Sequence, residues 1–342
     1  MKKSIKETIH SDRPKNFVTE ILKELTPKIG ASLLIEPEYE YTGLITFSNG
    51  KRVFYRNTRF NINPLGSVEV AKDKNYASFF LKHFGYVVPE GKTFFNEELN
   101  ENLEVKRNID DGYTYAKLLG FPVIIKPNNF SQGLFVTKVF NKKEYYRVAK
   151  KILKETNVLI VERFYSGNDF RIVVLDGRII SAYHREPLNI TGDGKKSVLE
   201  LLRVKQDDFI AKGRDTILDF EDYRIKLKMK KHKITFDSII PLNQTIQLLD
   251  NANLSTGGMS YDYTQTIHPD YANLAINITK DMELRLCGVD IMTHDISQPL
   301  SDYVIIEINS SPGLDNYAAL GNEQQKIVEN LYLQILKSLE KS

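Results

Sequence analysis

The apolar residues of this chain come in short runs, and strand-type and helix-type runs follow one another in no regular order. Val123-Ile124-Ile125 is one such run, and all of them are far below the roughly 18 residues that a membrane-spanning helix needs. Regular alternation of strands and helices would indicate a parallel α/β sheet, whereas irregular mixing favours an α+β fold. We therefore expect an α+β protein without a membrane helix. Its 342 residues favour two or three packed units.

Charge and cysteine content exclude several classes of protein. The 47 Lys and Arg residues against 44 Asp and Glu residues give a net charge of +3, which does not suggest a general binder of nucleic acid. Cys287 is the only cysteine, so a disulfide framework and a cysteine-based zinc site are both excluded. Met1-Lys2-Lys3 is not followed by the apolar segment of a signal peptide. We expect a cytoplasmic protein.

Local patterns predict the main elements. Apolar spacing indicates helices over about 12–29, 71–83, 113–119, 142–155 and from 324 onward. Strand signals cover a hairpin at 44–57 and segments 123–126, 158–161, 171–175, 178–183, 289–292 and 304–308. Gly192-Asp193-Gly194 is typical of a structural turn, and the pair Ser197 and Glu200 predicts a capping box at the start of a helix.

Acidic residues in the last two predicted strands suggest a cation site. Glu307 and Asn309 are two residues apart and therefore face the same side of a strand. Asp290, on a paired neighbouring strand, would complete a set of oxygen ligands of the kind that Mg²⁺ or Mn²⁺ prefers. From spacing alone, unrelated acidic residues at strand ends explain the pattern equally well.

Two lysines suggest phosphate binding. Lys126 ends an apolar strand and precedes a polar, glycine-containing loop, and Lys74 lies at the start of a predicted helix. A strand-terminal lysine beside such a loop suits phosphate, through its charge and the free N–H groups of the loop. The loop does not match the Walker pattern. A solvated strand end is the alternative for Lys126.

The run 224–233 holds seven basic or histidine residues in ten positions, a density that is also found in nucleic-acid-binding segments. Apolar residues interrupt the run, and no ladder of aromatic residues accompanies it. We interpret it as the solvated face of a helix.

Seven stretches, read in order, are AKDK (71–74), VIIKPNNFSQG (123–133), VLIVERFYSGNDFRIVVLDGRI (158–179), GDGKKSVLELL (192–202), ANLSTGGMSYDYT (252–264), CGVDIM (287–292) and IIEINSSPG (305–313). Together they resemble the ATP-grasp family. The resemblance is closest to the ATP-grasp region of cyanophycin synthetase and of bifunctional glutamate–cysteine ligase/glutathione synthetase, and D-alanine–D-alanine ligase is more distant. It covers roughly residues 70 to 315.

The resemblance implies a role for many residues. It implies ATP-phosphate contacts for Lys74 and Lys126, a mobile phosphate-covering loop with Ser131, Gln132 and Gly133, an adenine-binding hinge at Glu162, Arg163, Phe164 and Tyr165, a ribose contact for Asp169, and magnesium ligation by Asp290, Glu307 and Asn309. Arg171 and Arg185 would contact phosphate or the acyl intermediate, with ordinary surface arginines as the alternative. Ser255, Thr256 and Gly257 would form an anion cradle, with a plain tight turn as the alternative.

The implied activity is that of an ATP-dependent carboxylate–amine ligase, which forms an amide or peptide bond through an acyl phosphate. Its substrates would be small carboxylates and amines, either amino acids or a short peptide. A ligase that modifies a larger peptide or a carrier-bound group, or an ATP-binding module without activity, are the alternatives. The implied fold has two α+β subdomains that grip ATP, at 71–165 and 166–342, after a short N-terminal α/β segment at 1–70. The sequence leaves open whether the protein forms a homodimer.

One position departs from the resembled enzymes, in which arginines typically precede the stretch equivalent to 252–258. This chain has Leu248-Leu249-Asp250-Asn251 there. A carboxylate at this place repels a second carboxylate of the substrate. We hypothesise that Asp250 recognises the ammonium of an amino-acid substrate, and a solvated loop residue is the alternative.

Overall fold

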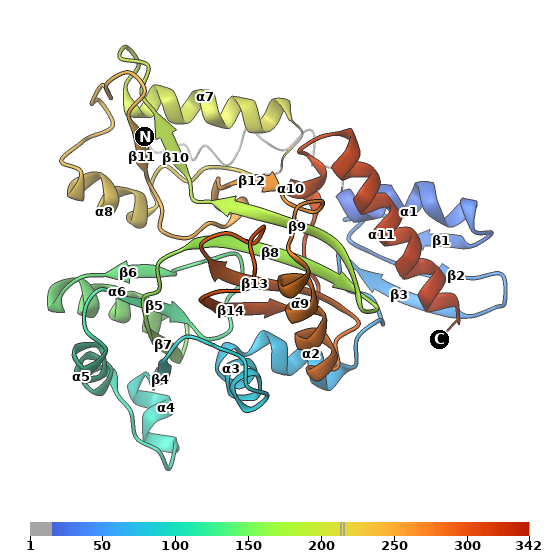
Figure 1. Cartoon of the computed structure of the whole chain (residues 1–342), viewed down its shortest axis with the longest axis horizontal. Coiled ribbons are helices and arrows are strands. Elements are labelled where there is room, and N and C mark those ends of the chain that lie inside the picture. Colours follow the sequence, from blue (N-terminus) through green and yellow to red (C-terminus); the bar gives the residue numbers. More distant parts are fainter. Residues whose placement is uncertain (1–15, 213, 215, 342) are drawn as a thin grey trace. The chain divides into compact units, whose positions relative to one another are not determined.

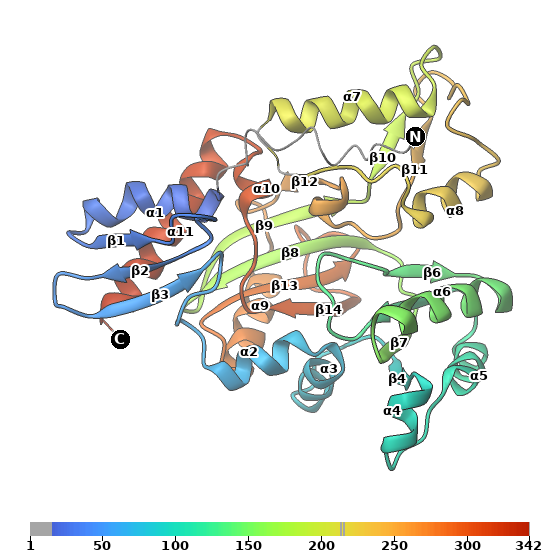
Figure 2. The same cartoon turned by 180° about the vertical axis from the view of Figure 1, so that it is seen from behind.

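The computed structural model describes residues 16–212, 214 and 216–341, which belong to two compact units (Figures 1 and 2). The first unit contains the residues up to Ile62 together with those from Gly313 onward, and the second is Asn63–Pro312. Helices and antiparallel sheets are mixed, so the α+β prediction is confirmed. Within the described residues, no helix has the length and apolar character needed to cross a membrane.

The first unit packs helices against a small antiparallel sheet. Its elements are α1 (Phe17–Lys28), β1 (Ser32–Ile35), β2 (Thr42–Thr46), β3 (Arg52–Arg56), α10 (Asp315–Ala318) and α11 (Asn322–Lys341), with strand order β1-β2-β3. Val53 and Tyr55 alternate with exposed residues along β3, which gives the sheet one buried face. Helix α11 packs on α1. This grouping differs from the division drawn from sequence, which placed α11 with residues 166–342. The apolar face of a helix does not indicate, from sequence alone, which distant segment packs against it.

The main sheet of the second unit has five strands in the order β12-β9-β8-β13-β14. Their bounds are β8 (Asn168–Leu175), β9 (Arg178–Glu186), β12 (Met259–Asp262), β13 (Leu286–Thr293) and β14 (Tyr303–Asn309). Helices α2 (Leu65–Lys72), α3 (Lys74–His83) and α9 (Pro269–Asp281) pack against it, and β13 is buried along nearly its whole length. The helix predicted over 71–83 is confirmed for 74–83 by α3, and only its start is wrong, because residues 71 and 72 belong to α2. Asp73 is extended and caps α3 by accepting a hydrogen bond from the Tyr76 N–H, so the chain turns there.

A smaller sheet has the order β4-β7-β5-β6, formed by β4 (Gly91–Phe95), β5 (Val123–Pro127), β6 (Thr137–Val139) and β7 (Val158–Arg163). Helices α5 (Ile109–Leu119) and α6 (Lys142–Glu155) pack on it and on each other (Figure 1), and α4 (Glu97–Asn102) follows β4. Apolar residues on one side of α6 are fully buried, which is why its helical spacing could be read from sequence.

Residues 188–249 have a hydrophobic cluster of their own. The elements here are β10 (Asn189–Thr191), α7 (Val198–Ala211), α8 (Tyr223–Lys231) and β11 (Thr245–Gln247), with β10 paired to β11. The capping box of Ser197 and Glu200 is confirmed at the start of α7. The predicted turn is confirmed as well, because Gly194 has a positive φ and Asp193 accepts hydrogen bonds from the next two lysine N–H groups.

Candidate functional site

The acidic residues of the last two strands are neighbours in the sheet. Strands β13 and β14 are antiparallel, with Asp290 directly opposite Glu307 and Gly288 opposite Asn309. Between them, Val289 and Ile308 are buried in the hydrophobic core. The expected pairing of the two strands is therefore confirmed, and it brings two carboxylates and one amide to the same place.

Two arginines from neighbouring strands bind Asp290. The Arg171 guanidinium donates from Nε to Oδ1 at 2.6 Å and from Nη2 to Oδ2 at 2.7 Å, and Arg185 Nη2 lies 2.9 Å from Oδ2. Burial opposes ionisation of Asp290, but the two guanidinium groups outweigh it and keep its pKa below the ordinary value. The alternative that these are ordinary surface arginines is wrong, because Arg185 is only 5% exposed and Arg171 is bound at both ends of its fork.

Asp169 extends this cluster along β8. Its Oδ1 accepts a hydrogen bond from Arg185 Nη2 at 2.5 Å. Burial is the largest influence on this carboxyl and keeps its pKa above the ordinary value, although Arg185 pulls in the other direction. Two guanidinium groups and two carboxylates thus alternate across the strands, and a change in any one of them alters the electrostatic field at the others.

Lys74 connects Glu307 to the loop after β5. Its Nζ lies 3.3 Å from Glu307 Oε1 and donates to the Phe130 carbonyl at 2.6 Å. Asn128, which pattern analysis missed, fixes this arrangement: its side chain donates to Asp73 at 2.6 Å, and its carbonyl accepts from the Lys74 N–H at 3.3 Å. One asparagine among several polar residues of a loop carries no signal of such a role.

Lys126 and Glu162 form a second, deeper ion pair. Strands β5 and β7 are antiparallel neighbours, and Lys126 Nζ lies 2.7 Å from Glu162 Oε2. Lys126 is only 4% exposed, so the alternative of a solvated strand end is wrong. A cleft lined by Lys74, Glu162 and Glu307, together with apolar side chains of α3 and β14, joins this pair to the acidic cluster.

The predicted hinge, residues 162–165, begins in the last two residues of β7. Arg163 pairs with Glu90 at 2.8 Å, and the Glu90 N–H donates to the Tyr165 hydroxyl at 3.4 Å. The ammonium of Lys138 stands over the ring of Phe164, 3.3 Å from its centroid. These contacts order the segment on one side of the cleft. The assignment of its backbone to adenine stays a prediction.

Ser255 and Thr256 lie in a short 3-10 turn, Leu254–Thr256, which Gly257 ends with a φ of 97°. The Asn253 side chain accepts from the Ser255 N–H at 2.8 Å, and the Thr256 hydroxyl donates to the Asn253 carbonyl at 3.0 Å. The structure thus shows a tight turn with the Ser255 side chain partly exposed. Its use as an anion cradle stays a prediction.

The acidic cluster fits a cation shared with a ligand. Among the residues that the structure describes, no three His, Cys, Asp or Glu side chains converge as they would in a cage built from protein alone. Two carboxylates and the side-chain amide oxygen of Asn309 remain as oxygen ligands at this place. Such a donor set suits Mg²⁺ that takes its other ligands from phosphate and water.

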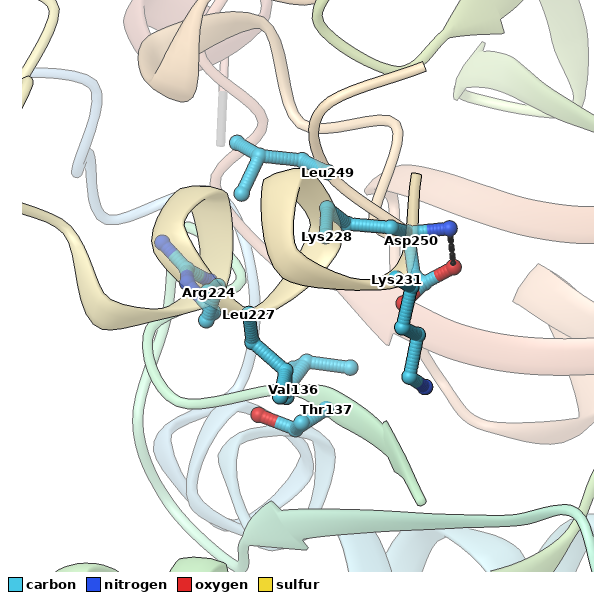
Figure 3. Close-up of a pocket in the computed structure, with 8 residues that line it drawn as sticks. All are labelled: Val136, Thr137, Arg224, Leu227, Lys228, Lys231, Leu249 and Asp250. Carbon is cyan, nitrogen blue, oxygen red and sulfur yellow. Dashed lines mark ion pairs between the residues drawn. The ribbon is translucent and has the colours of Figure 1, made fainter. Parts of the chain in front are cut away.

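The hypothesis about Asp250 needs correction. Its Oδ1 lies 2.6 Å from Nζ of Lys228, so an ammonium does bind it, but this ammonium belongs to the chain itself (Figure 3). The prediction that the basic run is helical is confirmed by α8, whereas its interpretation as a solvated face is only partly correct. Arg224, Ile225 and Met229 are buried.

Comparison with known proteins gives matches along most of the chain. Residues 249–331 match the RimK-like ATP-grasp domain, and residues 80–194 match the D-ala D-ala ligase C-terminus. Cyanophycin synthetase of Crocosphaera subtropica is 33% identical over 276 residues, which are 77% of this chain and 30% of that protein. The glutathione biosynthesis bifunctional protein GshAB of Clostridium perfringens is 27% identical over 284 residues, 79% of this chain and 35% of that protein.

The crystal structure of a bifunctional glutathione synthetase from Pasteurella multocida is similar with a TM-score of 0.59 at 24% identity, over 94% of this chain and 44% of that one. The chain spans about a third of the length of the curated relatives that it matches.

Proposed function

Because the chain has the ATP-grasp fold, we propose that it is an ATP-dependent carboxylate–amine ligase that acts on an amino acid or a short peptide. The observation that carries the proposal is the cluster on β8, β9, β13 and β14, where Asp290 and Glu307 are opposite each other and two arginines and Lys74 lie beside them. Its negative and positive groups are those needed to bind a metal–triphosphate and to stabilise charge during phosphoryl transfer.

In the proposed reaction, an oxygen of the substrate carboxylate attacks the γ-phosphorus of ATP, and the bond to ADP breaks. An amine then attacks the carbonyl carbon of the acyl phosphate, phosphate leaves, and the amine nitrogen loses a proton. The chain needs no covalent nucleophile for this. It binds the reactants in line, neutralises charge and excludes water from the acyl phosphate.

Particular side chains serve these tasks. Lys74 and Lys126 provide charge for the phosphates, and Arg171 and Arg185 provide guanidinium forks beside the transferred group. Asp290, Glu307 and Asn309 would hold Mg²⁺, which supplies further neutralisation of the phosphate charge. Lys74 and Glu307 are paired with each other at 3.3 Å. When a metal–nucleotide binds, this ion pair would be replaced by a contact of Lys74 with phosphate and a contact of Glu307 with the metal.

The test is ADP formation by the purified chain with Mg²⁺ and ATP, in a pool of amino acids and dipeptides, with mass spectrometry of the products. We expect ADP, phosphate and an amide whose mass is the sum of the masses of the acid and the amine less one water. Nucleotide binding without ADP in any pool would overturn the ligase proposal for small substrates. A cytoplasmic location, where ATP is supplied, is part of the proposal. The homodimer stays a prediction, which a molar mass measured by light scattering would test.

A further inference from the structure

The loop 130–135, called here the Gly133 loop, has an unusual backbone. Gln132, Gly133 and Phe135 have φ values of 58°, 65° and 60°. Only glycine adopts this left-handed region freely, and any other residue that does so has its Cβ close to the neighbouring carbonyl oxygen. Two non-glycine residues therefore occupy an unfavourable conformation in the segment expected to cover the triphosphate. Contacts from outside the loop must stabilise it.

Helix α8 makes one of these contacts. Arg224 donates from Nη1 to the Gly133 carbonyl at 2.6 Å, although the two residues are 91 positions apart. The Arg224 side chain is 8% exposed, and its fork is held by Asp222, with Nη2 2.6 Å from Oδ2. Beside it, the Tyr223 hydroxyl lies 2.8 Å from that of Thr137, at the start of β6. A buried charge that donates to a main-chain carbonyl is a strong and directional contact.

Asn251 joins the same loop to the turn at 254–256. Its Nδ2 donates to the Thr256 hydroxyl at 3.3 Å, and its Oδ1 lies 3.4 Å from Arg224 Nη1. The Asn251 amide also packs so closely on Gly133 that an added Cβ there would collide with it. Glycine at 133 therefore suits both the positive φ and the close approach of the Asn251 amide.

Two lysines of α8 contact different parts of the second unit, Lys228 the segment around residue 250 and Lys231 helix α6. In Figure 3, Lys228 extends from α8 to Asp250, and Val136 and Thr137 line the same pocket beside the helix. Lys231 is 3.4 Å from Glu144 of α6 and stands over the Phe140 ring. These lysines bind acidic and aromatic groups of the chain itself, which accounts for part of the basic run without a nucleic acid.

We propose that Arg224 and Asn251 are positioning residues that form a latch, holding the Gly133 loop and the Ser255–Gly257 turn in register. This rests on the proposed function and on the roles that the resemblance implies, a cover over the phosphates of ATP for the loop and an anion cradle for the turn. The latch makes closure over ATP depend on the same side chains that order the turn. Loss of the latch should therefore weaken nucleotide binding and expose the acyl phosphate to water.

The test compares Arg224→Ala, Arg224→Lys and Asn251→Ala with the wild type. Lys230→Ala is the matched control, because Lys230 is solvent-exposed on the same helix. Hydrogen–deuterium exchange of peptides covering residues 128–137 is followed with and without Mg²⁺ and adenylyl imidodiphosphate, a non-hydrolysable ATP analogue. Exchange of α9 reports whether the fold is intact.

We expect Arg224→Ala and Asn251→Ala each to lose at least about tenfold of the protection of residues 131–135 and to bind the analogue about tenfold more weakly, while α9 is unchanged. The double variant Arg224→Ala/Asn251→Ala should lose little more protection than either single variant, because both residues belong to one contact network. Lys230→Ala should match the wild type. Arg224→Lys keeps the charge but not the fork, so it should keep the fold and only part of the protection.

Protection of the loop within twofold of the wild type in Arg224→Ala would overturn the latch. If that variant does not fold, the same criterion applies to Arg224→Lys.

Failure of the proposed function would give a different result. The wild type itself would not bind the analogue, and hydrogen–deuterium exchange in the free protein would still decide whether Arg224 holds the loop. With a substrate pair in hand, a rise in ADP formed per amide in Arg224→Ala supports the latch, and an unchanged ratio counts against it.

Discussion

Replacement of Lys126 by methionine tests the buried pair most directly. The substitution keeps the length of the side chain and removes its charge, which leaves the Glu162 carboxylate buried without its partner. At the observed separation of 2.7 Å, the attraction lost is about 6 kcal/mol for an effective dielectric constant of about 20. Part of this is offset because Lys126 no longer has to be desolvated. Breaking a buried pair typically costs about 3 to 5 kcal/mol.

We therefore expect Lys126→Met to lower the unfolding midpoint by roughly 6 to 20 °C, since about 1 kcal/mol corresponds to roughly 2 to 4 °C for a unit of this size. The double variant Lys126→Met/Glu162→Gln should recover most of the loss, because it contains no unpaired buried charge. Lys92→Met, on the exposed side of β4, is the matched control and should change little. Differential scanning calorimetry measures all four proteins.

Nucleotide binding separates the structural role of Lys126 from its proposed role at the phosphates. A charge-assisted contact is worth about 1.5 to 3 kcal/mol, so both Lys126 variants should bind Mg²⁺–ADP about 10- to 100-fold more weakly, including the double variant that is stable. Isothermal titration calorimetry gives the affinities. Wild-type affinity in the double variant would refute the phosphate contact, and an unchanged midpoint in Lys126→Met would refute the account of the buried pair.

Three further predictions concern other parts of the site. Glu307→Gln should reduce ADP formation by about 100-fold or more at saturating magnesium with the fold intact, because it removes a proposed metal ligand; near-wild-type turnover in a coupled ADP assay would contradict this. Asp250→Asn should lower the free energy of unfolding by about 1 kcal/mol through loss of the partly exposed pair with Lys228, and it should leave the choice between a substrate and its analogue without an amino group unchanged in a competition assay. Burial lowers the pKa of His184 below its ordinary 6.5, so the unfolded chain binds a proton that the folded chain resists, and stability should fall as pH drops below about 6.5; the slope of melting temperature against pH should be shallower in His184→Gln.

Features that depend on nearby residues could be predicted from the sequence. The two-residue spacing of Glu307 and Asn309, the capping box of Ser197 and Glu200, and the apolar stripe of α6 all rest on contacts or alternation within a few residues. Backbone geometry alone relates such neighbours, because a strand repeats every two residues and a helix every 3.6. The order of the seven stretches also predicted the fold that the comparisons show.

The surroundings of these features were decided by the tertiary structure. Arg171 lies 119 positions from Asp290, and the pairing of β8 with β13 brings them together. The sequence around Lys126 does not distinguish it from a lysine on the surface. Its charge can be buried because β7 places the Glu162 carboxylate beside it. Arg224 reaches Gly133 across 91 positions from a helix whose sequence suggested a solvated face. Local patterns fix which side of an element a residue occupies. Which distant charge meets it depends on how the sheets and helices pack, because the energy of an ion pair depends on separation and burial in space and not on distance along the chain.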